Sequence, residues 1–263
     1  MTADRSVVAE VAAELRDVER SGTALALVTE RLDDIDWHTA RAIARARDAL
    51  RVADGDELIG YKLGWTSAQM RAALGIDRPN WGTLWSSQRL GRTLDLGPLR
   101  HPKVEPEIVY VADRELVGPD VSSQDVIRRA RGWAVGIEVV HPRWPSYDFT
   151  WLDNTADNSS AHAVTFGDVE RHDGDIAAVS VEFTDRTEHR TGRGDRAMGS
   201  PAEAVAWLVR SLAAEDRGLE PGQIVFTGGL TAPFDVVDGG RYTLRSPQLG
   251  SIGLDATDVP EGS

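Results

Sequence analysis

The sequence has no cysteine among its 263 residues, and this absence removes several kinds of chemistry at once. Disulfide bridges, thiolate metal ligands and a cysteine nucleophile are all excluded. Any metal site must therefore use oxygen ligands, with or without histidine. Oxygen ligands suit a hard cation best.

Basic residues are scarce relative to acidic ones, with 29 Lys and Arg against 42 Asp and Glu and a net charge of −13. Such a charge repels polyanions and argues against nucleic acid or an anionic membrane as the main partner. No apolar run approaches the ~20 residues needed to cross a bilayer. The start, "MTADRSVVAEVAAELRDVERSG", carries acids through what would be the apolar region of a signal peptide. We therefore expect a cytoplasmic protein.

What the sequence does contain is enough apolar residues, 41%, for one large domain or two small ones. Helical spacing recurs in the first fifty residues, for example at Val8, Val11 and Leu15. A later helix is predicted in "SPAEAVAWLVRSLAAEDRG", beginning at the cap residue Ser200 and ending at Gly218.

From Leu58 onward the chain changes to short apolar runs separated by glycine and proline, which is typical of strands. No internal repeat at a fixed period is present. These patterns predict an α+β protein, with a helical N-terminal part at 1–57 and a β-rich core at 58–263 that carries the active site.

The segment "HPKVEPEIVYV" places Glu105 and Glu107 in a predicted strand. Side chains alternate between the faces of a strand, so the two carboxylates share a face ~7 Å apart. A divalent cation would offset their repulsion, whereas a solvated strand face explains the pair equally well. Pro106 between them predicts an edge strand or a bulge at this point.

Two further charged residues interrupt apolar strand patterns. Glu138 lies in "WAVGIEVVHPRW", where a buried carboxylate needs a cation unless it faces solvent. Lys62 lies in "LIGYKLGWTS", where it either extends to solvent or binds a substrate carboxylate or enolate. Both alternatives stay open for each residue.

Two turns are candidates for substrate contacts. "DNTADNSSAH" gathers polar side chains, among them Ser160, into a turn that suits either a capped loop or donors to an oxyanion. "FTGGLTAPF" places two glycines after a strand, so backbone N–H groups at Thr227 and Gly228 can approach a ligand, although a plain turn also fits.

Six blocks occur in an order and spacing that resemble the fumarylacetoacetate hydrolase superfamily: "GYKLGWTS", "LGIDRPNWGTL", "HPKVEPEI", "GIEVV", "DNTADNSSA" and "FTGGL". They are most similar to its 2-keto-4-pentenoate hydratase and 4-oxalocrotonate decarboxylase branch, from about Leu58 to near Leu254. The resemblance implies mixed β-sheets rolled around a metal site, a helical N-terminal part and a homo-oligomer.

The resemblance also implies roles for individual residues. The family's Mg²⁺ or Mn²⁺ is held by three carboxylates, which match Glu105, Glu107 and Glu138. Its strand lysine, its acidic residue in the "G-(I/V)-D-x-P" block and its motif serine match Lys62, Asp77 and Ser160.

The implied substrate is a small 2-oxo or 2-hydroxy-dienoic acid that chelates the metal and passes through a dienolate. In a hydratase of 2-hydroxy-2,4-dienoates a base must aim water at carbon, and Asp77 is the candidate. The alternatives are a 4-oxalocrotonate-type decarboxylase, or a non-catalytic family member that binds a small acid.

Three features depart from the branch and leave the exact substrate open. His141 stands where the branch commonly has an aspartate after the third glutamate, and Trp65 follows the glycine of "KLG". The chain also contains eight tryptophans. The blocks around Asp77 and Ser160 favour a hydratase, whereas the aromatic stretch "RWPSYDF" is more similar to the decarboxylases.

Overall fold

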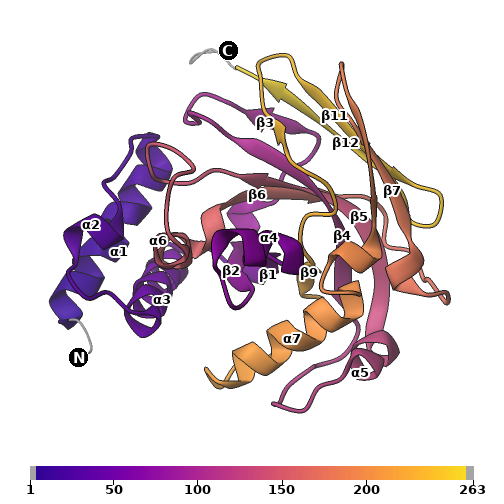
Figure 1. Cartoon of the computed structure of the whole chain (residues 1–263), viewed down its shortest axis with the longest axis horizontal. Helices are drawn as coiled ribbons and strands as arrows, with labels where there is room; N and C mark the ends of the chain where they lie inside the picture. Colours follow the sequence, from indigo (N-terminus) through magenta and orange to yellow (C-terminus); the bar gives the residue numbers. More distant parts are fainter. Residues whose placement is uncertain (1–3, 259–263) are drawn as a thin grey trace.

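The computed structural model describes residues 4–258 and begins with three helices that pack beside the sheets (Figure 1). These helices are α1 (Arg5–Ser21), α2 (Val28–Arg31) and α3 (Trp37–Ala53). Val11 and Leu15 of α1 and Ile43 of α3 are buried in one core with Trp144 and Ala156 from the middle of the chain. Among the described residues, no helix is both long and apolar enough to cross a membrane.

A seven-stranded mixed sheet forms the centre of the molecule. Its order is β2-β1-β9-β4-β5-β6, and β10 pairs with β4. The strands are β1 (Leu58–Gly64), β2 (Asn80–Trp85), β4 (Lys103–Ala112), β5 (Ala130–Val140), β6 (Ala161–Phe166), β9 (Ile224–Phe226) and β10 (Phe234–Asp235). Only β1 and β9 run parallel to each other, and every other pairing in this sheet is antiparallel.

A five-stranded sheet in the order β3-β12-β11-β7-β8 packs against the first. Its strands are β3 (Thr93–Asp95), β7 (Ser180–Thr184), β8 (His189–Arg193), β11 (Arg241–Ser246) and β12 (Gly250–Thr257). Apolar residues of both sheets, such as Ile108 and Leu244, share the main core with α7 (Pro201–Ala213). The predicted α+β class is confirmed.

The remaining helices are short and lie between strands. They are α4 (Ala68–Leu74), α5 (Ser123–Arg128), α6 (Trp151–Ala156) and the 3₁₀ turns η1 (Ser86–Gln88), η2 (Asn158–Ser160), η3 (Ile176–Ala178) and η4 (Gly194–Arg196). The polar segment "DNTADNSSAH" is thus a helix followed by a tight turn. Its helix begins at Thr150 and Asp153, whose side chains cap each other's backbone N–H groups.

The helix α7 ends earlier than the sequence predicts. It begins at Ser200, whose side chain accepts a hydrogen bond from the N–H of Ala202, as expected. It ends at Ala213 rather than Gly218, because the N–H groups of Glu215 and Arg217 both turn back to the carbonyl of Leu212. These bonds close the last turn before the glycine is reached.

The prediction that Pro106 marks an edge or a bulge is wrong. β4 lies inside the sheet, and Pro106 faces Ile137 of β5 in an uninterrupted part of that ladder. On its other side β4 pairs with β9 at residues 109–111 and with β10 at residues 103–104. The turn between β9 and β10 leaves the ladder beside Pro106, so the missing N–H of proline costs no strand pairing there.

Candidate active site

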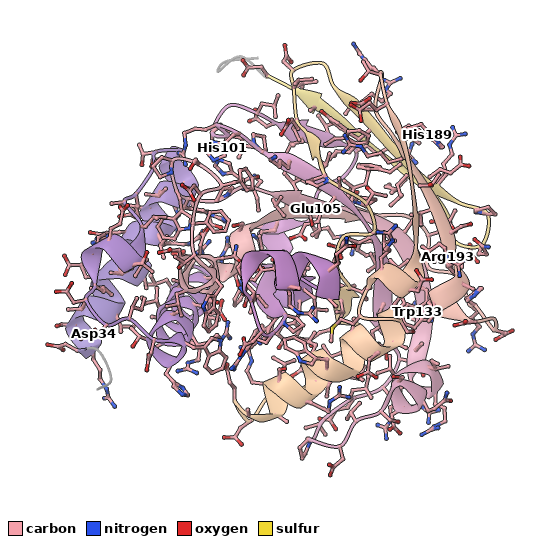
Figure 2. The ribbon with its side chains drawn as sticks, in the orientation of Figure 1. Asp34, His101, Glu105, Trp133, His189 and Arg193 are labelled. Carbon is pink, nitrogen blue, oxygen red and sulfur yellow. The ribbon has the colours of Figure 1, made fainter. Side chains whose placement is uncertain are left out.

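Three glutamates from β4 and β5 converge near the middle of the molecule, where Figure 2 labels Glu105. The antiparallel register sets Glu105 directly opposite Glu138, and Glu107 follows on the same face of β4. One carboxylate oxygen from each lies within 4.8 Å of the others. Glu107 and Glu138 are fully buried, whereas Glu105 is half-buried. Neighbouring strands thus bring three acids into one cluster.

The cluster is electrostatically unfavourable without a cation. Burial, with the negative charge of Glu138 beside it, raises the pKa of Glu107 well above its usual range. Burial likewise raises the pKa of Glu138 to about 7, because the ammonium of Lys62 offsets only part of the effect. Burial also raises the pKa of Glu105. Each carboxyl is therefore harder to ionise in this protein than in water.

The donor set fits a hard divalent cation. Oε1 of Glu107 and Oε2 of Glu138 are buried and accept no hydrogen bond among the described residues. Buried carboxylate oxygens without partners are strongly unfavourable unless a cation binds them. Since all three donors are carboxylate oxygens, Mg²⁺, Mn²⁺ or Ca²⁺ suits them better than a softer metal.

Lys62 of β1 lies beside the cluster and is buried. Its Nζ is 3.2 Å from Oε1 of Glu138, and it donates to the carbonyl and the hydroxyl of Ser159 at 3.0 and 3.3 Å. Burial alone would lower the pKa of Lys62, but the glutamates raise it above its usual value. Lys62 is therefore a charged, hydrogen-bonded ammonium and does not extend to the surface.

A cavity of about 160 Å³ opens onto these residues. Three of the sequence-predicted site residues line it, namely Lys62, Glu105 and Ser160. The rest of the wall is mostly aromatic and small polar: Gly64, Trp65, Thr66, Ser67, Val140, Tyr147, Phe149, Asn154, Ser159, Gly229, Thr231 and Pro233. Since Lys62 is the only cationic side chain in this lining, a bound acid group would find its charge partner at that end of the cavity.

Ser160 is oriented by two neighbours in its own motif. Its Oγ accepts a hydrogen bond from Nδ2 of Asn154 at 3.0 Å and lies 3.5 Å from Oδ2 of Asp157. Asn154 in turn accepts from Nδ2 of Asn80 at the start of β2. The hydroxyl is thus held in a defined direction at the cavity wall.

Thr227 and Gly228, predicted to contact substrate, are not brought to the cavity wall. The N–H and the hydroxyl of Thr227 both donate to the carbonyl of Ile108. The N–H of Gly228 donates to Oε2 of Glu107 at 2.6 Å. The expected donors are therefore used to hold β4 and a carboxylate of the cluster, and the following residues face the cavity instead, Gly229 and Thr231.

Asp77 is also outside the cavity. Its side chain is 72% exposed and pairs with the neighbouring Arg78 at 3.1 Å. That pairing lowers the pKa of Asp77. The residue lies between α4 and β2, and α4 begins one residue after Ser67, which lines the cavity. In this conformation Asp77 cannot reach a substrate bound at Lys62.

The two departures from the family pattern have different surroundings. Trp65 lines the cavity and has a left-handed backbone with φ 53°. His141 lies behind the cavity between the rings of His101 and His162, and its Nε2 accepts from the N–H of Arg100. Burial lowers the pKa of His141 to about 2, so it is neutral.

Several lining residues were missed by the sequence analysis. Asn154 and Ser159 lie within a motif that the sequence analysis singled out, but nothing in the sequence indicates which of its polar side chains face inward. Tyr147 and Phe149 stand in an irregular segment after β5, where no periodicity assigns a face. Tyr147 is anchored there because its hydroxyl donates to the carbonyls of His101 and Val140.

The comparisons with known proteins agree on one group of enzymes. No family model matches the chain. A 2-keto-4-pentenoate hydratase from Paraburkholderia phymatum is 32% identical over 95% of this chain and 97% of that protein. A 4-oxalocrotonate decarboxylase from Pseudomonas putida is 29% identical over 95% and 97%. The solved structure of 4-oxalocrotonate decarboxylase from Pseudomonas putida G7, complexed with magnesium and adipate, superposes with a TM-score of 0.93 at 27% identity, covering 97% of this chain and 99% of that one.

Proposed function

Since the chain belongs to the 2-keto-4-pentenoate hydratase and 4-oxalocrotonate decarboxylase branch of the fumarylacetoacetate hydrolase superfamily, a group of lyases, we propose that it is a metal-dependent hydratase. Its substrates would be 2-hydroxy-2,4-dienoates and its products 4-hydroxy-2-oxo acids. The observation that carries this proposal is the cluster of three glutamates beside a buried lysine at the cavity.

We assign Glu105, Glu107 and Glu138 as the ligands of Mg²⁺, or of Mn²⁺. The unpartnered oxygens and raised pKa values of the buried pair support this assignment. When bound, such an ion supplies a Lewis acid that stabilises negative charge on a substrate oxygen. The N–H of Gly228 would keep one oxygen of Glu107 occupied, so that the other is directed to the metal.

Lys62 would bind the acid or enolate oxygen of the substrate. Its ammonium is charged and already lies at the cavity, so no proton transfer is needed before it can stabilise an anion. Ser160, held by Asn154, would donate or accept a hydrogen bond at the same end of the substrate. The aromatic wall of Tyr147 and Phe149 would exclude water from the remaining side.

Asp77 would be the base that aims water at carbon, and this role requires movement. The segment from α4 to β2 follows directly on the cavity residues Thr66 and Ser67. We infer that this segment closes over bound substrate and carries Asp77 into hydrogen-bonding range of the attacking water.

Decarboxylation of a 2-oxo-enedioate is the second candidate. The likeness to a decarboxylase complexed with adipate, a dicarboxylate, favours it. The cavity argues the other way, because its described lining contains no second cation for a distal carboxylate. A homo-oligomer is part of the proposal for either activity.

A spectrophotometric assay separates these activities. The protein would be given 2-hydroxypenta-2,4-dienoate or a 2-oxo-enedioate, each with Mg²⁺ and with a chelator. We expect Mg²⁺-dependent loss of the dienol absorbance with formation of a 4-hydroxy-2-oxo acid and no carbon dioxide. Release of carbon dioxide from the enedioate without any hydration would establish the decarboxylase instead.

A further inference from the structure

The turn η2 has an unusual backbone. Asn158, Ser159 and Ser160 have φ values of 55°, 56° and 55°, so three consecutive residues with a Cβ occupy the left-handed region. Asparagine tolerates that region, but serine does so at a cost in free energy. All three residues are buried. Such a conformation persists only where the surroundings fix it.

Contacts from three directions fix this turn. The Asn158 side chain accepts from the N–H of Thr83 at 2.7 Å and donates to the carbonyl of the same residue at 2.9 Å. Gly82 leaves the space for it, because a Cβ there would lie 2.4 Å from the Asn158 carbonyl oxygen. At the start of the turn, Oδ2 of Asp157 accepts from the N–H of Arg143 at 3.1 Å.

What the turn presents to the cavity is Ser159. Its carbonyl and its hydroxyl both accept from Nζ of Lys62, and Oε1 of Glu138 is the third partner, at 3.2 Å. The three donors of the ammonium therefore meet three acceptors. Gly64 leaves room for the hydroxyl, since a Cβ on Gly64 would lie 2.7 Å from Oγ of Ser159.

We propose that Ser159 is a positioning residue, which holds the ammonium of Lys62 toward the cavity with its carbonyl and hydroxyl from a left-handed turn. The inference rests on the proposed function, because it assumes that Lys62 binds the substrate anion. A glycine at 159 would relieve the backbone and keep the carbonyl, but it would lose the hydroxyl. The protein thus keeps a less stable residue where its side chain contacts Lys62.

This proposal predicts opposite effects on stability and activity in one variant. Ser159→Gly should raise the melting temperature by roughly 2–4 °C relative to Ser159→Ala, because only glycine relieves the left-handed strain. Both variants should lower kcat roughly tenfold, since each removes a hydrogen bond to a charged group. Binding of Mg²⁺ with oxalate should change less than threefold in both. Asp216→Gly is the matched control, because Asp216 has φ 55° in an exposed turn far along the chain, and it should gain stability with kcat unchanged.

A readout on Lys62 itself does not depend on turnover. The sequence has only two lysines, Lys62 and Lys103, so ¹⁵N-lysine labelling gives two ammonium signals in an NMR spectrum. We expect the hydrogens of the Lys62 ammonium to exchange with water roughly tenfold faster in Ser159→Ala and in Ser159→Gly than in the wild type. The signal of the half-exposed Lys103 should not change.

The outcomes are distinguishable. If the ammonium exchange of Lys62 and kcat are both unchanged in the two variants, Ser159 does not position Lys62 and the inference is overturned. If ammonium exchange accelerates but the wild type turns over no dienoate and binds no Mg²⁺ with oxalate, the positioning stands and the proposed function fails. Equal stability of Ser159→Gly and Ser159→Ala would remove the strain from the account.

Discussion

At the scale of single residues, Lys62 and Glu138 illustrate how the site balances burial against charge. Each is expensive to bury alone, and each is the nearest opposite charge of the other, at 3.2 Å. The remaining negative charge of Glu105 and Glu107 is not balanced by any described cation of comparable proximity. The site is thus arranged for one more positive charge, and the ligand chemistry points to a divalent ion.

Lys62→Met keeps most of the apolar stem and removes the charge. We expect kcat/KM for a dienoate to fall by roughly 10²-fold, the usual size of a lost charge-stabilising contact. Mg²⁺ should still bind, since all three glutamates remain. Steady-state kinetics and calorimetric titration with Mg²⁺ measure the two quantities. Lys103→Met is the control, because Lys103 pairs with the exposed Asp235 and should leave kcat/KM unchanged; an unaltered Lys62→Met would assign Lys62 to structure alone.

Asp77→Asn tests the proposed base. Asp77 is exposed and pairs only locally, so its replacement should leave the melting temperature within about 1 °C of the wild type. Hydration should fall by roughly 10²-fold or more, the usual contribution of a positioned base. Binding of Mg²⁺ and oxalate should be retained. Undiminished hydration by this variant would mean that water is activated by another group and that the segment after α4 need not close.

At the scale of elements, the N-terminal helices are joined to the motif of Ser159 and Ser160 by a buried ion network. Glu19 of α1 pairs with Arg47 of α3 at 3.2 Å and with Arg143 at 3.1 Å, and Arg51 is a further partner. Arg47 and Arg143 both reach Asp157, which begins η2. The helices therefore support the loop that lines the cavity, although they contribute no lining residue themselves.

Glu19→Gln should destabilise the fold by about 3–5 kcal/mol, because it leaves three buried guanidinium groups without their shared anion. Urea unfolding measures the change. Glu14→Gln is the matched control on the same helix. Glu14 pairs with the partly exposed Arg31, so its loss should cost no more than about 1 kcal/mol. Equal effects of the two variants would show that the network does not join the helices to the loop.

The same network predicts a pH dependence of stability. Burial alone would raise the pKa of Glu19, but Arg47, Arg143 and Arg51 together hold it well below 4.5. A carboxyl whose pKa is lowered by folding stabilises the protein fully above its unfolded pKa and loses that contribution as the pH falls. Urea unfolding between pH 3 and 7 should therefore show a steeper loss below about pH 4.5 in the wild type than in Glu19→Gln. Parallel curves would contradict this.

At the scale of the whole molecule, metal binding should stabilise the native state because the unfolded chain has no converged carboxylates. At a Mg²⁺ concentration 100 times the dissociation constant, the gain is about 2.7 kcal/mol, or roughly 5–10 °C in melting temperature. Glu107→Gln should abolish most of this gain without lowering the melting temperature of the metal-free protein, since it removes one of the mutually repelling acids. Differential scanning fluorimetry with Mg²⁺ or a chelator tests both; an equal Mg²⁺ response in Glu107→Gln would place the metal elsewhere.

The sequence by itself determined the α+β class, the helical start and most strands, because these depend on local periodicity and on glycine and proline. It also identified Glu105, Glu107, Glu138 and Lys62, since charged residues inside apolar strand patterns are visible without a fold. Family blocks supplied the rest of the candidates. Local signals of this kind survive into the structure when the strand itself fixes the direction of the side chain.

Only the tertiary structure decided which candidates meet. The register of β4 against β5 set Glu105 opposite Glu138, and no pattern within either strand encodes that pairing. It also turned Gly228 toward Glu107, left Asp77 on the surface and folded Ser159 onto Lys62, 97 residues away in the sequence. These contacts depend on long-range packing, in which a loop takes whatever backbone its neighbours impose, including the left-handed turn that holds the lysine.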